Sequence, residues 1–351
     1  MNFAFTDEQA MIAETARAFF AEHATSARTR AAMAGDGVDH ALWAAFCGEL
    51  GLGGVALPEA DGGSGLGMVE FCTVAEAAGA QVAALPLLGL ATAGQAIAAG
   101  GSDAQRAEWL PKLIAGEVIA AAQVADGLRV EQGKLTGSVD FVPHGVAASL
   151  FVLAVQGDAW IVRTDAPGVS VMAQTTMDQT RPFARIDLDS AAADALADGA
   201  AAVGVLHAGG WLCLAAEALG GAQATLDRTV AYSRERVQFG RPIGSFQAYK
   251  HRLADMMVAI EQARSAVYWA ACAHDEAAPD VGLALHAAKS FCADAFFKCA
   301  GDMIQLHGGI GFTWEHDAHL FFKRARSIQT MLGSGAWHRE QVAEMILGEA
   351  A

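Results

Sequence analysis

Residues 234–251 read RERVQFGRPIGSFQAYKH, in which a basic cluster is followed by a Gly-Arg-Pro turn and the start of a new helix. Helical patterns lie on both sides of this stretch and continue toward the C-terminus, at about 204–234, 246–275, 280–306 and 334–347. Most of these segments are far longer than the average helix of a globular protein. Helices of this length bury their apolar faces against one another, so the sequence predicts a C-terminal four-helix bundle over 201–351.

The N-terminal third of the chain is also helical in pattern. Thr6-Asp7-Glu8-Gln9 forms a capping box, which predicts a helix from about 7 to 22. Helical patterning continues at 41–50, 68–78 and 103–115, with a glycine-rich turn at 58–65 between the first two segments. These segments predict an N-terminal helical domain over 1–118.

Between 119 and 200 the period of the hydrophobic pattern changes. Segments rich in β-branched residues at 151–155, 160–162 and 169–172 are separated by Gly-Asp or Ala-Pro-Gly turns. This pattern predicts a small, antiparallel middle β-domain. The expected fold class is therefore α+β, mostly α, with three domains in the order helix, strand, helix.

The composition excludes several kinds of partner. The 351 residues carry 39 acidic and 23 basic side chains, a net charge of −16 that disfavours nucleic acid. The six cysteines form no C-x-x-C pair and no zinc-type spacing, so no metal site is expected and the compartment is predicted to be reducing.

Two uncharged stretches, 77–101 and 199–216, are long enough to be considered as membrane-spanning helices. The first contains glutamines, a proline and several glycines, and the second is mostly alanine and glycine. Both are therefore predicted to be buried core helices. The first residues lack the basic and apolar regions of a signal peptide, so we expect a cytoplasmic protein.

Four blocks in order along the chain resemble the acyl-CoA dehydrogenase family. They are the stretch at 234–251, QLHGGIGFTWEH at 305–316, ELGL at 49–52 with the Pro-Glu and Gly-Gly pairs of 58–63, and the segment at 110–117. The first block is the most specific. The resemblance implies the family's helix, strand, helix fold and its reaction, the FAD-dependent α,β-desaturation of an acyl-CoA thioester.

The resemblance also implies which residues hold FAD. Glycine amides can approach a pyrophosphate closely, and an arginine can pair with it bidentately. In the family, residues of this group are donated across a dimer interface to an FAD held mostly by the neighbouring subunit. A homo- or hetero-oligomer is therefore implied, with an electron acceptor such as electron-transfer flavoprotein. The predicted cofactor residues are Arg236, Gln238, Phe239, Gln247, Gln305, Gly308, Gly309 and Ser334. The alternative for Arg236 is a surface ion pair with Glu235 or Glu261.

The family's catalytic carboxylate is missing from both of its known positions. Ungapped counting from Gly308 puts Leu332 at the commoner one, and a leucine cannot accept a proton. Counting back from Arg236 reaches Gly210 and Trp211 at the other. The nearest acid on that helix is Glu217, which we interpret as a structural carboxylate in preference to a relocated base.

The middle domain also departs from the family. The Thr-Glu-Pro-x-x-Gly-Ser-Asp-like loop that cradles flavin is absent from 122–127. The family's Trp-x-Thr beside the flavin ring aligns with 141–143, where Phe141 can still stack on a ring but Pro143 offers neither a hydroxyl nor an N–H. The losses lie on the side of the site that a subunit supplies to its own flavin.

This asymmetry resembles the smaller, base-lacking subunits of heteromeric acyl-CoA dehydrogenases, such as those acting on steroid side-chain CoA thioesters. The leading hypothesis is a subunit that completes the FAD site while a paralogous partner supplies the glutamate. Two alternatives stay open. One is a homo-oligomeric enzyme with a relocated base, and the other is a flavin-binding scaffold without chemistry of its own.

Overall fold

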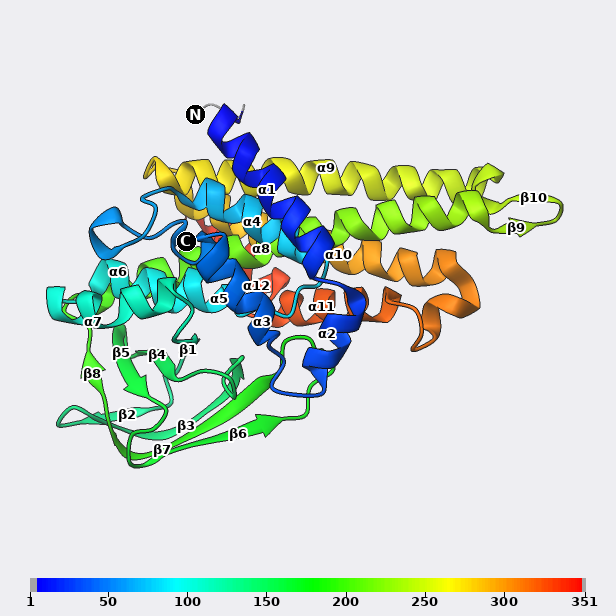
Figure 1. Cartoon of the computed structure of the whole chain (residues 1–351). Coiled ribbons are helices and arrows are strands. Elements are labelled where there is room, and N and C mark those ends of the chain that lie inside the picture. Colours follow the sequence, from blue (N-terminus) through cyan, green and yellow to red (C-terminus); the bar gives the residue numbers. More distant parts are fainter. Residues whose placement is uncertain (1–4, 349–351) are drawn as a thin grey trace. The chain divides into compact units, whose positions relative to one another are not determined.

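The computed structural model describes residues 5–348 and divides into two compact units. Unit 1 combines 5–26, 72–83 and 211–348, and unit 2 combines 27–71 and 84–210. Figure 1 labels the helices and strands of both. The mostly helical α+β class with middle sheets is confirmed. The domain boundaries at 118 and 200 stay predictions.

Unit 1 is built on long helices. They are α1 (Asp7–His23), α8 (Gly199–Glu235), which starts in unit 2, α9 (Gln247–Asp275), α10 (Val281–His307), α11 (Ala318–Thr330) and α12 (Gly335–Leu347). The predicted capping box is present at the start of α1, where the Thr6 hydroxyl accepts the N–H of Gln9. α10 packs against α9, α11 and α12, and the fully buried rings of Phe296 on α10 and Phe321 on α11 lie against α8.

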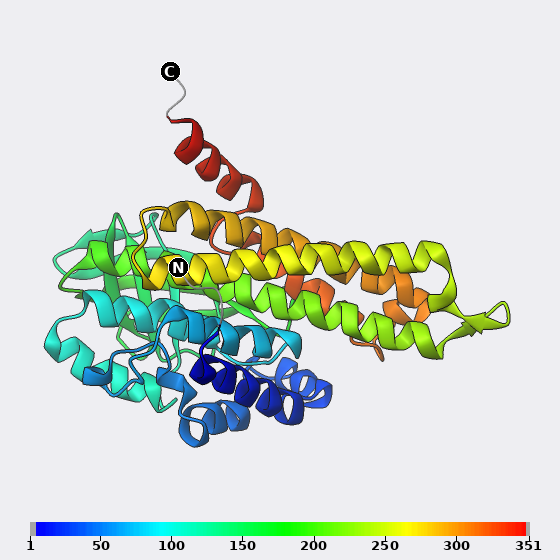
Figure 2. The ribbon, with the colours of Figure 1, turned by 90° about the horizontal axis from the view of Figure 1, so that it is seen from above.

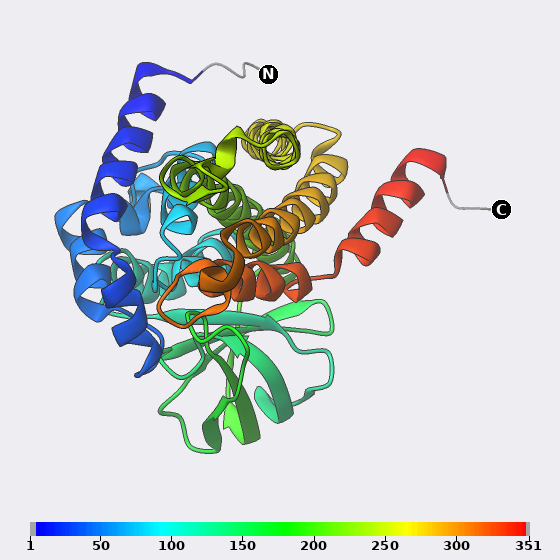
Figure 3. The ribbon, with the colours of Figure 1, turned by 90° about the vertical axis from the view of Figure 1, so that its right-hand side faces the viewer.

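The bundle differs from its prediction in one helix. The sequence pattern predicts 334–347 as the fourth member and does not predict α11. α11 buries an apolar face that includes Leu320, Phe321 and Ile328, whereas His338 is the one buried residue of α12. Figures 2 and 3 show α12 leaving the bundle, with its C-terminal turns away from the other helices. The bundle is therefore closed by α11.

Unit 2 holds the shorter helices and the sheets. Its helices are α2 (Ser26–Met33), α3 (His40–Ala44), α5 (Leu87–Gly89), α6 (Gln95–Gly100) and α7 (Asp103–Ile114), with π-helical turns at Ala45–Glu49 and Leu90–Gly94 and 3₁₀ turns at Leu52–Gly54 and Glu59–Asp61. α4 (Met68–Ala80) runs from this unit into unit 1. The predicted segment at 41–50 is therefore helical, although a π-helical turn follows its first α-helical turn.

Two four-stranded sheets form the middle of the chain. One has the order β1-β4-β5-β8, from Ala120–Val124, Leu150–Val155, Asp158–Arg163 and Asp194–Ala195. The other has the order β2-β3-β7-β6, from Arg129–Glu131, Lys134–Pro143, Phe183–Ala192 and Val169–Gln174. All pairs are antiparallel as predicted except β1 with β4, which is parallel. The chain passes through the other sheet between these two strands, so β4 re-enters in the direction of β1.

The apolar helix α8 is long and apolar enough by composition to cross a membrane, and 67% of its most apolar window is buried inside the protein. It is therefore a core helix, as predicted from 199–216. All six cysteines are free thiols. Burial raises the pKa of the Cys47, Cys292 and Cys299 thiols to about 12, so they are protonated core residues.

Candidate functional site

A two-stranded hairpin joins α8 to α9. β9 (Val237–Gln238) pairs with β10 (Arg241–Pro242), which leaves Phe239 and Gly240 as a two-residue turn with φ of 53° and 75°. Turns of this type favour asparagine, aspartate or glycine in the first position. Phe239 stands there instead and is 92% exposed, with one edge contact to Phe246 at 6.2 Å. Strain and exposure at the same residue point to a contact outside this chain.

Arg236 precedes the hairpin and is presented by a fixed backbone. Its N–H donates to the carbonyl of Tyr232 at 2.9 Å, and its carbonyl accepts the N–H of Ile243 at 2.8 Å. Within residues 5–348 its exposed guanidinium has no hydrogen bond or ion pair. The expected alternative partner, Glu261, lies 3.6 Å from Arg264 instead. The guanidinium is therefore available for an anion such as a phosphate.

A glycine loop follows α10, in the 3₁₀ turn η6 (Gly308–Phe312). Gly308 has a φ of 65°, which a side chain would strain. Gly309 has no positive φ, and a Cβ built on it meets nothing within 4 Å. Neither the conformation nor the packing of this chain requires a glycine at 309. A glycine there leaves the backbone open to close approach by a group from outside the chain.

Two tyrosines hold the glycine loop at the hairpin end of the bundle. Tyr232 on α8 donates to the carbonyl of His307 at 3.3 Å and stacks on its ring at 4.4 Å. Tyr249 on α9 donates to the carbonyl of Leu306 at 3.1 Å, and burial raises its pKa to about 12, so it remains a neutral donor. The hairpin and η6 therefore occupy the same end of the bundle (Figures 1 and 2). Neither tyrosine was predicted as a site residue, although Tyr249 lies inside the most specific block and Tyr232 lies two residues before it.

The two loops together, which we name the bundle tip (236–242 and 308–312), expose an unusual amount of apolar surface. Single exposed apolar residues are common in proteins, but a cluster of them marks an interaction surface. Trp314 lies just beyond η6 and is 61% exposed. The exposed apolar residues of the tip are Val237, Phe239, Ile310 and Phe312.

Three predicted glutamines surround the tip and are exposed. The amide of Gln238 donates to the carbonyl of Val237 at 2.9 Å. Gln247 starts α9 and Gln305 lies in the last turn of α10, and their side chains make no hydrogen bond within the described part of the chain. Ser334 is placed elsewhere. Its hydroxyl accepts the N–H of Trp337 at 3.2 Å and caps α12, and no described hydrogen bond or ring contact links it to the tip.

Neither predicted base position holds a carboxylate, and Leu332 and Trp211 both lie in unit 1. Leu332 sits in the turn between α11 and α12 with a φ of 51°, and its carbonyl accepts the indole N–H of Trp211 at 2.8 Å. The two positions therefore touch each other. Glu217 is 3% exposed and lies 3.5 Å from the equally buried guanidinium of Arg324. This ion pair supports the structural interpretation of Glu217.

In unit 2, Phe141 occupies a bulge of β3. Its φ is 59°, and its ring is 60% exposed. Gln174 accepts its N–H and Gln123 donates to its carbonyl, both at 2.9 Å. Bulges of this kind redirect a side chain. The sequence analysis singled out Phe141 but not Gln174, which is 33 residues away and carries no local signal. Pro143 pairs with Phe183 inside the sheet.

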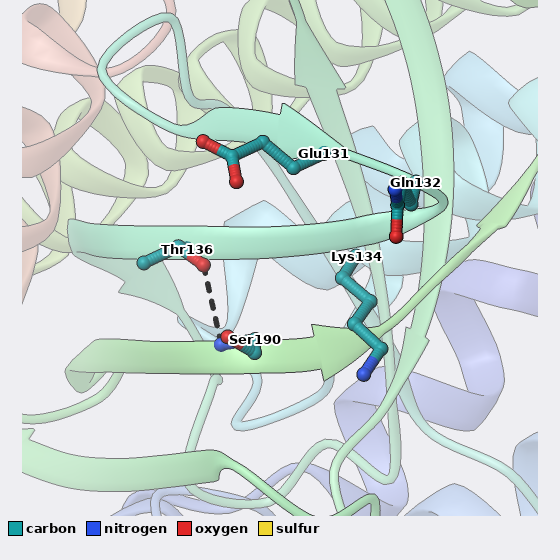
Figure 4. A pocket seen from close by; sticks show the side chains of 5 residues that line it. All are labelled: Glu131, Gln132, Lys134, Thr136 and Ser190. Atoms are coloured by element: carbon teal, nitrogen blue, oxygen red, sulfur yellow. Dashed lines mark hydrogen bonds between the residues drawn. The ribbon is translucent and has the colours of Figure 1, made fainter.

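One cavity of unit 2 is lined by none of the predicted site residues. Figure 4 shows a polar hollow of about 490 Å³ beside the β2–β3 turn. Its lining is Glu131, Gln132, Lys134, Thr136 and Ser190, and the N–H of Ser190 donates to the Thr136 hydroxyl at 3.2 Å. A search of residues 5–348 finds no cluster of His, Cys, Asp or Glu that could hold a metal ion.

Comparison with known proteins gives matches along most of the chain. The family model described as acyl-CoA dehydrogenase, N-terminal domain, matches residues 6–117, and that of the C-terminal domain matches 198–347. The acyl-CoA dehydrogenase IpdE2 of Mycobacterium tuberculosis is 37% identical over 334 residues, which cover 93% of this chain and 94% of that protein.

Solved structures give the same result. The steroid enzyme Tcur3481-Tcur3483, as a G363A variant, superposes with a TM-score of 0.88 at 31% identity, over 97% of this chain and 98% of that one. A chain of the ChsE4-ChsE5 complex from Mycobacterium tuberculosis has a TM-score of 0.90 at 26% identity, over the whole of both chains.

Proposed function

Because the chain belongs to the acyl-CoA dehydrogenase family, we propose that it is the subunit of a hetero-oligomeric enzyme that completes the FAD site while a paralogous partner supplies the catalytic glutamate. Enzymes of this family are FAD-dependent oxidoreductases that act on CH–CH bonds. Similar proteins include components of two-protein complexes, one of them described as a steroid enzyme.

A single contrast carries the proposal. Several of the residues that the family donates to a neighbour's flavin are present at the bundle tip, where Arg236 is unpaired within the described chain and Phe239 is exposed. The residues that a subunit needs for its own reaction are missing or committed elsewhere, as Leu332 and the ion-paired Glu217 illustrate.

The groups at the tip fit a dinucleotide. Gly309 leaves open space for a pyrophosphate, Arg236 offers a charge-assisted pair to it, and the free amide of Gln305 adds a neutral donor. FAD, when bound, supplies the hydride acceptor of the reaction. The role of this chain is then to hold and orient the cofactor and, through the apolar tip, to exclude water from it.

The desaturation needs a base that this chain does not offer. The α-carbon of the thioester loses a proton, the β-carbon loses a hydride, and a double bond forms between them. Proton uptake requires a carboxylate close to the α-carbon, and in this proposal it belongs to the partner. We further propose a CoA thioester of a steroid-derived acid as substrate, electron-transfer flavoprotein as electron acceptor and a cytoplasmic complex.

The relocated-base alternative is weaker because Glu217 is already paired with Arg324 in the core. A carboxylate committed to a buried ion pair would have to leave its arginine before it could act on a substrate. The scaffold alternative is not favoured by any particular contact. A second acyl-CoA dehydrogenase with a glutamate at either base position is the partner that the leading proposal requires.

The test compares this chain alone with its complex. Alone it should bind little FAD and show no desaturation, at least about 10²–10⁴-fold below the complex, because the base is absent. Co-expressed with a base-bearing paralogue, it should carry about one FAD per heterodimer. A yellow, fully flavinated homo-oligomer that desaturates a CoA thioester, and loses this activity on Glu217→Gln, would establish the relocated base instead.

A further inference from the structure

The turn between α11 and α12 is held in a conformation that costs free energy. Leu332 has a φ of 51° and Gly333 a φ of 105°. A left-handed leucine is disfavoured and persists only where surrounding contacts determine it. A Cβ on Gly333 would lie 2.6 Å from the ring of Trp337 and 2.9 Å from Nε2 of His338. The turn is therefore packed closely against α12.

Two donors from different helices bind the carbonyl of Leu332. The Trp211 indole of α8 donates to it at 2.8 Å, and Nε2 of His338 on α12 lies 3.1 Å from it. A carbonyl oxygen can only accept, so Nε2 of His338 carries a hydrogen. These two side chains and the Leu332 carbonyl form what we name the carbonyl clamp.

A second histidine fixes the ring of His338. Nδ1 of His286 on α10 lies 2.8 Å from Nδ1 of His338, so a single hydrogen lies between the two atoms. In the neutral pair, the Nε2 hydrogen of His338 leaves its Nδ1 as acceptor, and His286 donates from Nδ1. The Trp211 ring packs on His286 at 4.5 Å and on His338 at 5.2 Å. Three helices thus converge on one peptide group.

The position of this peptide connects the clamp to the cofactor. Leu332 stands where the resemblance puts the base, and Ser334, two residues on, is a predicted FAD residue. The Ser334 hydroxyl accepts the N–H of Trp337 at 3.2 Å, which leaves its O–H able to donate outward from an exposed side chain. The direction of that O–H depends on the turn.

We propose that Trp211 and His338 are positioning residues, which hold the Leu332 carbonyl and thereby fix Ser334 for a hydrogen bond to FAD. This inference rests on the proposed function. The turn keeps this role although the catalytic glutamate is absent. A fixed peptide at residue 332 orients Ser334 toward the cofactor even when the side chain at 332 is a leucine.

The first test measures FAD affinity in the complex with the base-bearing partner. Trp211→Phe keeps a ring in place and removes only the N–H. We expect the Kd for FAD to rise about 3–10-fold, as for the loss of one hydrogen bond. Trp269→Phe on α9, outside the clamp, is the matched control and should leave the Kd unchanged.

Arg236→Ala distinguishes a failure of the clamp inference from a failure of the proposed function. If it weakens FAD binding and Trp211→Phe does not, the clamp inference is wrong and the proposed function stands. If neither variant weakens FAD binding, both are wrong.

The second test needs no variant. In ¹⁵N-histidine spectra of the intact chain at neutral pH, His338 should be the Nε2–H tautomer and His286 the Nδ1–H tautomer. Protonation of His338 at Nδ1 with a bare Nε2 would remove the bond to Leu332 and overturn the clamp. This readout reports hydrogen positions, which a purely apolar contact between the same rings would not determine.

Discussion

The bundle tip and the carbonyl clamp belong to the same unit but differ in whether their polar groups find hydrogen-bond partners within this chain. At the clamp the donors bond to acceptors within this chain, as the Trp211 indole N–H does with the Leu332 carbonyl. At the tip, Arg236 has no side-chain partner within the described chain, and Phe239 is exposed on a strained turn; Gln305, next to the tip, also has no side-chain partner there. The contrast distinguishes polar groups that bond within this chain from polar groups that are available to bind another molecule.

Among the experiments that test this contrast, the largest effect is expected on cofactor binding. Arg236→Ala should weaken FAD retention by the complex by about 2–5 kcal/mol, because a desolvated phosphate loses its charged partner. The same change should leave the melting temperature of the isolated chain unchanged, since the guanidinium has no partner within the described residues.

Arg326→Ala is the matched control for that experiment. Arg326 is an exposed arginine on α11 whose guanidinium pairs with Gln329 at 2.9 Å. Its loss should leave FAD retention unchanged. Unchanged flavin content in purified Arg236→Ala complex would remove Arg236 from the site.

The interior of the bundle should respond to pH in a defined direction. Lys289 on α10 is fully buried, donates to the Ile328 carbonyl at 2.9 Å, and burial lowers its pKa from 10.5 to about 8. Between these values the unfolded chain binds more protons than the folded one. The free energy of unfolding should therefore rise with pH from about 8 to 10.5, by about 3 kcal/mol from this group.

Chemical denaturation across that range measures the effect, and Lys289→Met should flatten the rise. Lys298→Met, an exposed lysine on the same helix, is the control and should leave the profile as it is. A wild-type profile that falls over this interval would contradict the assignment.

The smallest effect concerns the strained turn at the tip. Phe239→Asn places a residue that tolerates positive φ in the first turn position. It should stabilise the isolated chain by about 0.5–1 kcal/mol while lowering FAD retention by the complex. Thermal unfolding of the lone chain and flavin content of the complex measure the two halves. A loss of stability in the lone chain would mean that Phe239 serves the fold and not a partner.

The sequence predicted those parts of the molecule that depend on local pattern. The capping box at Thr6, the helix, strand, helix order and the four-block family resemblance needed no knowledge of distant contacts. α11 was not predicted, although Leu320, Phe321 and Ile328 repeat at helical spacing. The parallel pairing of β1 with β4 has no local signature, since it depends on where the chain returns.

Only part of the site could be predicted from the sequence, because some of its contacts join residues that are far apart in the chain. Gly309 and Arg236 belong to a contiguous motif and could be named from it. The bond between Trp211 and Leu332 joins residues 121 positions apart, and Gln174 reaches Phe141 across 33 positions. No spacing rule in a single sequence predicts such pairs, because they form only when helices or strands pack. The assignment of Ser334 to the FAD site stays a prediction.

The thiols of this chain have a practical consequence. Cys47, Cys292 and Cys299 are buried with their pKa raised to about 12, and Cys72 and Cys213 are also buried, so these five react slowly with maleimides at neutral pH. Once the half-buried Cys272 is replaced by serine, a cysteine introduced at the exposed Val237 becomes the preferred attachment point for a dye. Such a label sits on the hairpin and allows subunit association to be followed by fluorescence, without touching the thiols that fill the core.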